Sequence, residues 1–248
     1  MRLAVLADIH ANVFALDAVL DDLAGRPIDQ IVDLGDVVYG PIAPKATLER
    51  LATIEHLTIR GNQDRAVADA TDDDLATNPT MAFVHADLET GDLAALGALP
   101  TEQQLDEAIF LCHGSPTSDV EYLLEDLGTD GHPHVADDAT ILDRLAGRRS
   151  ELILCGHTHV PRVVRLSTGQ TVVNPGSVGL PAYADDQPVP HVMQTFSPDA
   201  SYALVERIDT GWRVEHVRVP YDHRRAAEAC RRNGRDDWAD NVATGRAG

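Results

Sequence analysis

Five apolar segments of this chain are each followed at once by a short turn that carries aspartate, asparagine or histidine. The segments are residues 2–7, 30–34, 56–59, 108–112 and 152–155. In the first half they alternate with segments whose apolar residues recur at helical spacing, which predicts parallel strands joined by crossover helices. Ligands of open α/β sheets bind beyond the carboxyl ends of parallel strands. The five polar turns are therefore expected to meet at one sheet edge.

The rest of the chain changes character after residue 160. Strand-like segments joined by short turns predict antiparallel hairpins at residues 162–166, 171–174, 191–196, 202–208 and 212–219. Earlier helices are predicted at residues 13–23, 44–52, 80–99, 120–126 and 139–146, and a last one at residues 222–232. We predict a single domain over residues 1–232. Residues 233–248 are expected to form a polar tail that frays.

Composition limits the classes of function. The chain has 248 residues, 44% of them hydrophobic and 24% charged, which is typical of a globular protein. Its formal net charge of -20 disfavours general nucleic-acid binding. Any phosphate ligand then needs a local positive charge, which bound metal ions supply. The chain shows neither signal-peptide features nor an apolar run of ~20 residues that would span a membrane, so we expect a cytoplasmic protein.

The polar turns offer seven side chains that suit metal ions. They combine carboxylate, amide and imidazole groups without thiolates, which favours Mn, Fe, Zn or Co over Mg or Ca. Seven groups exceed what one ion usually takes, so two ions that share one carboxylate are expected. The seven residues are Asp8, His10, Asp36, Asn62, His113, His157 and His159.

The motifs around these residues resemble, in order, those of the calcineurin-like metallophosphoesterases. Residues 111–116 and 174–179 further resemble the bacterial branch of small phosphodiesterases in that superfamily. The resemblance implies an α/β fold in which two mixed β-sheets pack as a sandwich flanked by helices. The motifs are Asp8-Ile9-His10, Gly35-Asp36, Gly61-Asn62-Gln63-Asp64, His113-Gly114 and Gly156-His157-Thr158-His159.

The resemblance also assigns the ligands. It places one ion on Asp8, His10 and His159, and a second ion on Asn62, His113 and His157. Asp36 would bridge the two ions, for which Mn or Fe is favoured. Four charges from the metals less two from Asp8 and Asp36 leave a net charge of about +2 in the site.

The expected activity is hydrolysis of phosphodiesters by attack of a metal-bridging hydroxide, with nucleotides and cyclic nucleotides as candidate substrates. The alternatives are a protein phosphatase, a dinucleoside tetraphosphate hydrolase and a non-catalytic scaffold of the same fold. The partner is then a small phosphate ester rather than a membrane or a nucleic acid. The oligomeric state stays open, with a homodimer as one alternative.

One position departs from the superfamily pattern. Gln63 stands where a histidine often follows the asparagine, and glutamine donates a hydrogen bond but no proton. Asn62, Gln63 and Asp64 are the catalytic candidates, and the loss of a proton donor favours phosphodiesters with good leaving groups. Tyr39 either binds substrate with Asn62 and Gln63 or packs. His134 lies either in an exposed loop or in a lid that contacts phosphate.

Overall fold

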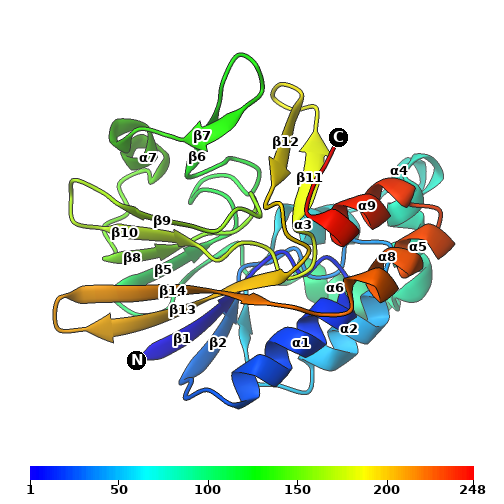
Figure 1. Cartoon of the computed structure of the whole chain (residues 1–248), viewed down its shortest axis with the longest axis horizontal. Helices are drawn as coiled ribbons and strands as arrows, with labels where there is room; N and C mark the ends of the chain where they lie inside the picture. Colours follow the sequence, from blue (N-terminus) through cyan, green and yellow to red (C-terminus); the bar gives the residue numbers. More distant parts are fainter.

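Two five-stranded mixed sheets form the centre of the computed structural model, which describes residues 1–248 (Figure 1). Each sheet contains three neighbouring parallel strands. Antiparallel strands lie on one side of them in the first sheet and on both sides in the second. The first sheet has the order β14 (Gly211–Val219), β13 (Ala200–Ile208), β1 (Arg2–Leu6), β2 (Gln30–Asp33) and β3 (Leu57–Thr58). The second has the order β4 (Glu102–Gln104), β5 (Ile109–Cys112), β8 (Leu152–Leu154), β10 (Thr171–Asn174) and β9 (Arg162–Arg165).

The sheets pack face to face because their strands are apolar on both sides. On β1, Leu3 and Val5 point into the core between the sheets, where they join Ile109 and Leu152 of the second sheet. The intervening residues of a strand point to its other face. That outer face of β1 is buried under helices, and the fold is the expected sandwich of two mixed sheets flanked by helices.

Helices cover both outer faces. On the first sheet lie α1 (Val13–Ala24), α2 (Pro44–Leu51), α5 (Pro79–Asp87) and α6 (Thr90–Gly97), and on the second lies α7 (Asp138–Arg144). The short helix α3 (Asn62–Ala68) begins at one of the polar turns, and α4 (Asp72–Thr77) follows it. Two small hairpins, β6 (Glu125–Leu127) with β7 (Pro133–Val135) and β11 (Ala182–Asp185) with β12 (His191–Gln194), project at the top of Figure 1.

Two predicted helices differ from the structure. The helix expected at residues 80–99 is two helices, because Leu88 and Glu89 adopt extended backbone conformations and the Asp92 side chain accepts the backbone N–H of Glu89 at the start of α6. The helix expected at residues 120–126 is absent. Leu123 and Leu124 are instead buried in the core beside α7, and residues 125–127 pair with β7. Apolar neighbours alone do not distinguish these two structures.

The prediction that residues 233–248 form a frayed tail was also wrong. Residues after α8 (His223–Arg232) form α9 (Asp236–Thr244), which packs on α8 and ends beside β11 (Figure 1). Trp238, Ala239 and Val242 form a buried stripe on α9. This short apolar stripe anchors a segment whose composition is otherwise polar.

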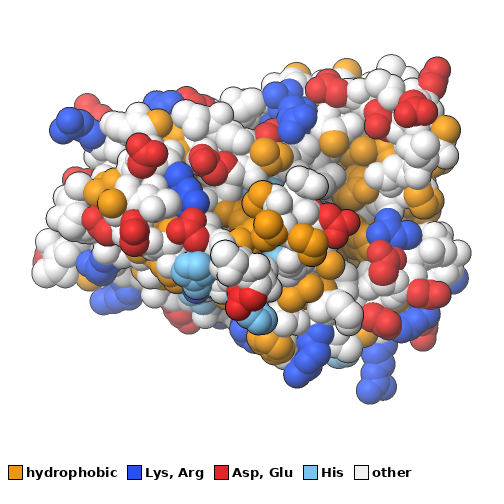
Figure 2. Space-filling model, turned by 90° about the horizontal axis from the view of Figure 1, so that it is seen from above, with side chains coloured by type: hydrophobic (Ala, Val, Ile, Leu, Met, Phe, Trp, Pro, Cys, Tyr) orange, Lys and Arg blue, Asp and Glu red, His pale blue; other side chains and the backbone are white.

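No helix is long and apolar enough to cross a membrane. On the face shown in Figure 2, Lys and Arg side chains are interspersed with Asp and Glu side chains. No patch of a single charge covers that face.

Candidate metal centre

The polar turns that follow the parallel strands come together at one edge of the sandwich. Ligand atoms of Asp8, His10 and His159 all lie within 4.8 Å of one another. Those of Asp36, His113 and His157 form a second group with the same spread. The amide oxygen of Asn62, at the start of α3, lies 2.9 Å from Nε2 of His113. The structure thus brings all seven predicted ligand residues together.

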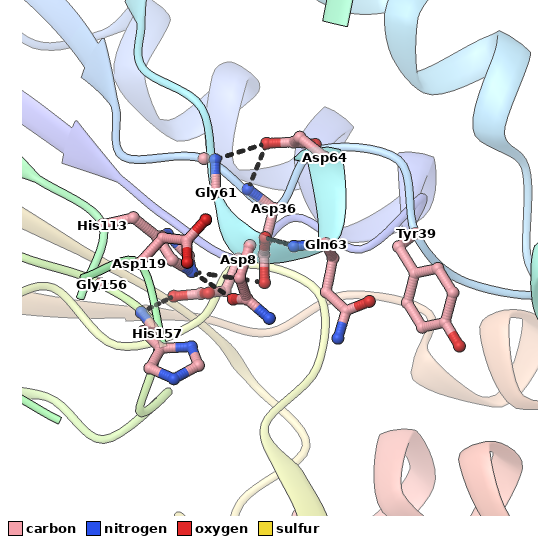
Figure 3. Close-up of polar contacts among 12 residues, drawn as sticks. Asp8, Asp36, Tyr39, Gly61, Gln63, Asp64, His113, Asp119, Gly156 and His157 are labelled. Atoms are coloured by element: carbon pink, nitrogen blue, oxygen red, sulfur yellow. Dashed lines mark hydrogen bonds and ion pairs between the residues drawn. The ribbon is translucent and has the colours of Figure 1, made fainter. Parts of the chain in front are cut away.

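Asp36 lies between the two groups. Its Oδ2 atom is 3.4 Å from Nε2 of His113 and 3.9 Å from Nε2 of His10. Its Oδ1 atom accepts a hydrogen bond of 2.8 Å from the backbone N–H of Gln63, which fixes the carboxylate plane (Figure 3). One oxygen is therefore held by the protein, and the other faces both groups.

Backbone carbonyl groups orient all four histidine rings. A ring N–H that donates to a carbonyl leaves the other ring nitrogen with a lone pair, as metal ligation requires. This contact uses Nε2 in His157 and Nδ1 in the other three rings. The distances are 2.8 Å from His10 to Tyr39, 2.7 Å from His113 to Leu34, 2.6 Å from His159 to Leu180 and 3.2 Å from His157 to Val120.

Five of the seven residues adopt a left-handed backbone conformation that residues other than glycine rarely take. Their φ angles lie at 56° in Asp8, 50° in His10, 60° in Asp36, 70° in His157 and 61° in His159. Hydrogen bonds between the turns hold this conformation, such as those from the Asp8 and His10 N–H groups to the carbonyls of Gly35 and Asp36. Such strain is found mainly at functional sites.

The two carboxylates carry the charge of the site. Burial alone would raise their pKa values, but His159 holds the pKa of Asp8 below its ordinary value and His113 does the same for Asp36. Burial opposes protonation of His113, yet Asp36 and Asp8 raise its pKa to about 10. Without a cation, a proton on His113 therefore balances the carboxylates, and a bound metal ion would displace it.

The donor set fits metal ions. Oδ1 of Asp8 is fully buried and has no hydrogen-bond partner, although a buried carboxylate oxygen ordinarily has one. The pKa values of His10 and His157 are lowered to about 4, chiefly by burial, so both rings are neutral at physiological pH and free to ligate. Imidazole and carboxylate groups together match the preferences of Mn, Fe, Zn and Co.

A cavity of about 560 Å³ opens on this edge. Tyr39, Asn62 and Gln63 line it, as do four of the other ligand residues. Tyr39 also packs its ring against Trp238, and its hydroxyl group bonds to Asn78. Tyr39 therefore packs, which was one of the two alternatives, and it also lines the cavity.

Two other candidates do not reach the cavity. Asp64 is fully buried, and its carboxylate accepts backbone N–H groups of Asp36, Val37 and Gly61. His134 lies exposed on β7 and touches only the carbonyl of His132. The lid alternative for His134 has no support in this arrangement.

The sequence analysis missed several residues around the site. The ring of Tyr183 on β11 lies 4.6 Å from that of His159, and its hydroxyl bonds to that of Tyr122. Trp238 on α9 lies edge-on to His10 at 5.7 Å. These contacts join segments far apart in the chain, and no local pattern marks them.

The turn at residues 174–179 has a structural role. Ser177 donates a hydrogen bond of 2.7 Å to the carbonyl of Asp8, and Asn174 donates one of 2.7 Å to the carbonyl of Gly156. The segment thus ties together two ligand-bearing turns. Ser177 shapes a turn and does not line the cavity.

Known proteins resemble this chain over nearly its whole length. A protein of Methanocaldococcus jannaschii described as uncharacterized is 27% identical over 258 residues, which cover 95% of this chain and 94% of that protein. The crystal structure of a metallophosphoesterase from Sphaerobacter thermophilus matches with a TM-score of 0.77 and 27% identity, over 99% of this chain and 100% of that one.

A hypothetical protein from Pyrococcus horikoshii has the same fold, with a TM-score of 0.76, 20% identity, and coverage of 100% of this chain and 99% of that one. The sequence model of the calcineurin-like phosphoesterase superfamily domain matches residues 1–196, which include all seven ligand positions. This protein belongs to the calcineurin-like phosphoesterase superfamily.

Proposed function

We propose that this protein is a dinuclear metal-dependent phosphoesterase that prefers small phosphodiesters. The observation that carries the proposal is the position of Asp36, whose Oδ2 atom faces a histidine from each ligand group at 3.4 and 3.9 Å. A carboxylate oxygen between two donor sets is suited to join two cations. Asp8, His10 and His159 would hold one ion, and Asn62, His113 and His157 the other.

The bound ions would supply positive charge for the phosphoryl oxygens and would activate water. Two divalent ions less two carboxylates give a local charge of about +2, in a chain of formal charge -20. Because the site is buried among low-dielectric walls, that local charge acts strongly on an anionic ester. The mixed nitrogen and oxygen ligands suit Mn, Fe, Zn or Co, and of these we propose Mn or Fe.

Gln63 sets the substrate preference that we propose. Its backbone N–H holds Asp36, and its side chain lines the cavity, where the amide can donate a hydrogen bond to an ester oxygen. An amide cannot deliver a proton to a departing alkoxide. Diesters with good leaving groups therefore suit the site better than unactivated monoesters.

Metal analysis and an ester panel test the proposal together. Purified protein should bind about two transition-metal ions per chain and hydrolyse bis(p-nitrophenyl) phosphate faster than p-nitrophenyl phosphate. Asp36→Asn should lose metal and activity together, whereas Asp73→Asn on the exposed first turn of α4 should keep both. A metal-loaded protein that hydrolyses no activated ester would instead support the scaffold alternative.

A further inference from the structure

Helix α9 forms a wall of the cavity that lies outside the superfamily match. The cavity is lined at one end by His10, Asp36 and other ligand residues, and at the other by residues of α9 and its flanks. The match ends at residue 196. The ligand residues thus belong to the shared domain, whereas this wall is a feature of the segment that follows it.

The wall is held firmly against the ligand groups. Trp238 is buried, and its ring lies edge-on to His10 and to Tyr39, at 5.7 and 6.1 Å. Ala239 and Val242 anchor the same helix on α8. The side chains that α9 turns toward the cavity therefore have fixed positions next to the site of chemistry.

Arg235 is the basic residue nearest to the start of this wall, but three of its five N–H donors are already in use. Its Nε atom donates to Oδ1 of Asp237 at 2.9 Å, and Nη2 donates to Oδ2 at 2.6 Å. Its Nη1 atom donates to the hydroxyl of Thr80. The guanidinium group also covers the ring of Trp238, with 5.5 Å to the ring centre. This bidentate pair offsets the charge of Arg235 and occupies the donor pair formed by Nε and Nη2, so Arg235 attracts a phosphate less strongly than a free arginine would.

The other charged residues that line this end of the cavity do not supply a phosphate site in place of Arg235. Asp185 and Asp240 also line the cavity, and Arg246 is exposed at its rim over the ring of Phe196. Away from the ligand groups the lining therefore holds three aspartates and two arginines, and one of the arginines is already paired with an aspartate. This end of the cavity favours uncharged groups that donate hydrogen bonds and repels a second phosphate.

We propose that the Arg235–Asp237 pair makes α9 a specificity wall that admits esters with one phosphate group and an uncharged organic part. This inference rests on the proposed function and deepens it. A cavity of about 560 Å³ lies in the range of small-molecule sites, which fits an organic part of mononucleoside size. Substrates with several phosphates, such as dinucleoside polyphosphates, are disfavoured by the same charges.

Two substrates that differ only in a remote phosphate test the proposal. Thymidine 5′-(p-nitrophenyl phosphate) and its 3′-phosphorylated form share the reacting group and the leaving group. At low ionic strength we expect kcat/KM to be about tenfold lower for the 3′-phosphorylated ester, mainly through KM. Equal kcat/KM values for the two esters would overturn the specificity wall and leave the phosphoesterase function intact.

Asp237→Asn isolates the ion pair. It frees Arg235, so the discrimination against the remote phosphate should shrink by about threefold or more, again through KM. Asp236→Asn is the matched control, because it removes the same charge from the neighbouring exposed position, which does not line the cavity. Equal effects of the two variants would show a general charge effect and contradict the role of the pair.

A binding measurement separates this inference from catalysis. Calorimetry with thymidine 5′-monophosphate and thymidine 3′,5′-bisphosphate should show weaker binding of the bisphosphate to the wild-type protein, and a smaller difference in Asp237→Asn. Failure to hydrolyse either ester would contradict the proposed function, while this binding difference would still support the wall. Equal binding of both nucleotides would overturn it.

Discussion

Oδ2 of Asp64 lies 2.7 Å from the backbone nitrogen of Asp36. The same oxygen accepts the N–H of Gly61 at 2.9 Å, and Oδ1 accepts the N–H of Val37 at 2.9 Å (Figure 3). Asp64 thus fixes the turn that presents Asp36 and the start of α3 at once. The acid that follows Gln63 is a positioning residue, and its carboxylate has no contact with the cavity.

Asp64→Asn should weaken metal binding without removing a ligand. An amide nitrogen cannot accept the N–H groups that a carboxylate oxygen accepts, so at least one buried donor loses its partner. We expect the free energy of unfolding to fall by about 1–3 kcal/mol, and the affinity for Mn²⁺ to fall with it. Urea denaturation and a Mn²⁺ titration measure the two effects.

Asp69→Asn is the control for this variant, because Asp69 lies exposed at the end of the same helix. It should change neither quantity. Wild-type metal affinity in Asp64→Asn would contradict the positioning role.

Two glycine substitutions should have opposite effects. A Cβ atom on Gly61 would overlap the carboxylate and the backbone nitrogen of Asp36, whereas one on Gly91 in α6 meets nothing within 4 Å. Gly61→Ala should cost about 1–3 kcal/mol of stability and reduce metal content. Gly91→Ala should add up to about 1 kcal/mol, because alanine favours the helix. Thermal melts with metal analysis compare them, and equal effects would refute the close approach at Gly61.

Gln63→His should change which esters are hydrolysed. An imidazolium group in the cavity can protonate a poor leaving group, which an amide cannot. We expect the ratio of diester to monoester hydrolysis to fall, with the larger gain for monoesters that have alkyl leaving groups. Gln187→His in the exposed loop between β11 and β12 is the control. An unchanged ratio in Gln63→His would disprove the assigned role of Gln63.

The strand pattern was sufficient to predict the convergence of the ligand residues, whereas the sandwich followed from the resemblance to the superfamily. Each of Asp8, Asp36 and His113 interrupts an apolar pattern just where a strand ends, and parallel strands bring such ends to one edge. Each such interruption lies within a short stretch of sequence, so it can be recognised without knowledge of the tertiary structure. For example, the position where β1 ends is enough to predict that Asp8 and His10 lie in the turn that follows it.

Other parts of the site depend on contacts that no local pattern encodes. Trp238 reaches His10 across more than two hundred residues, and its helix was hidden in a polar segment. The left-handed backbone of Asp8 is held by hydrogen bonds with distant turns, namely with the carbonyl of Gly35 and the hydroxyl of Ser177. The helix predicted at residues 80–99 is likewise interrupted at Leu88 and Glu89, where the backbone is extended and Asp92 accepts the N–H of Glu89.

Asp33 should make the metal-free protein less stable as the pH rises. Its side chain is fully buried on β2, Oδ2 has no hydrogen-bond partner, and Oδ1 accepts only the N–H of Gly35. Burial, and then the charge of Asp64, raise the pKa of Asp33 well above its ordinary value of 3.8. The folded protein therefore keeps a proton on Asp33 that the unfolded chain releases above about pH 4.

Because the folded state binds the extra proton, this group stabilises the fold at low pH and loses that effect as the pH rises through the folded-state pKa. The loss is at most about 1.4 kcal/mol per pH unit. Asp33→Asn keeps an oxygen for Gly35 and cannot ionise, so it should be more stable than the wild type at pH 8. The difference should vanish near pH 4.

Urea denaturation in EDTA from pH 4 to 8 measures this difference in the free energy of unfolding, with Asp73→Asn as the exposed control. If the free energies of unfolding of the wild type and Asp33→Asn change with pH in parallel, Asp33 is not buried in its neutral form.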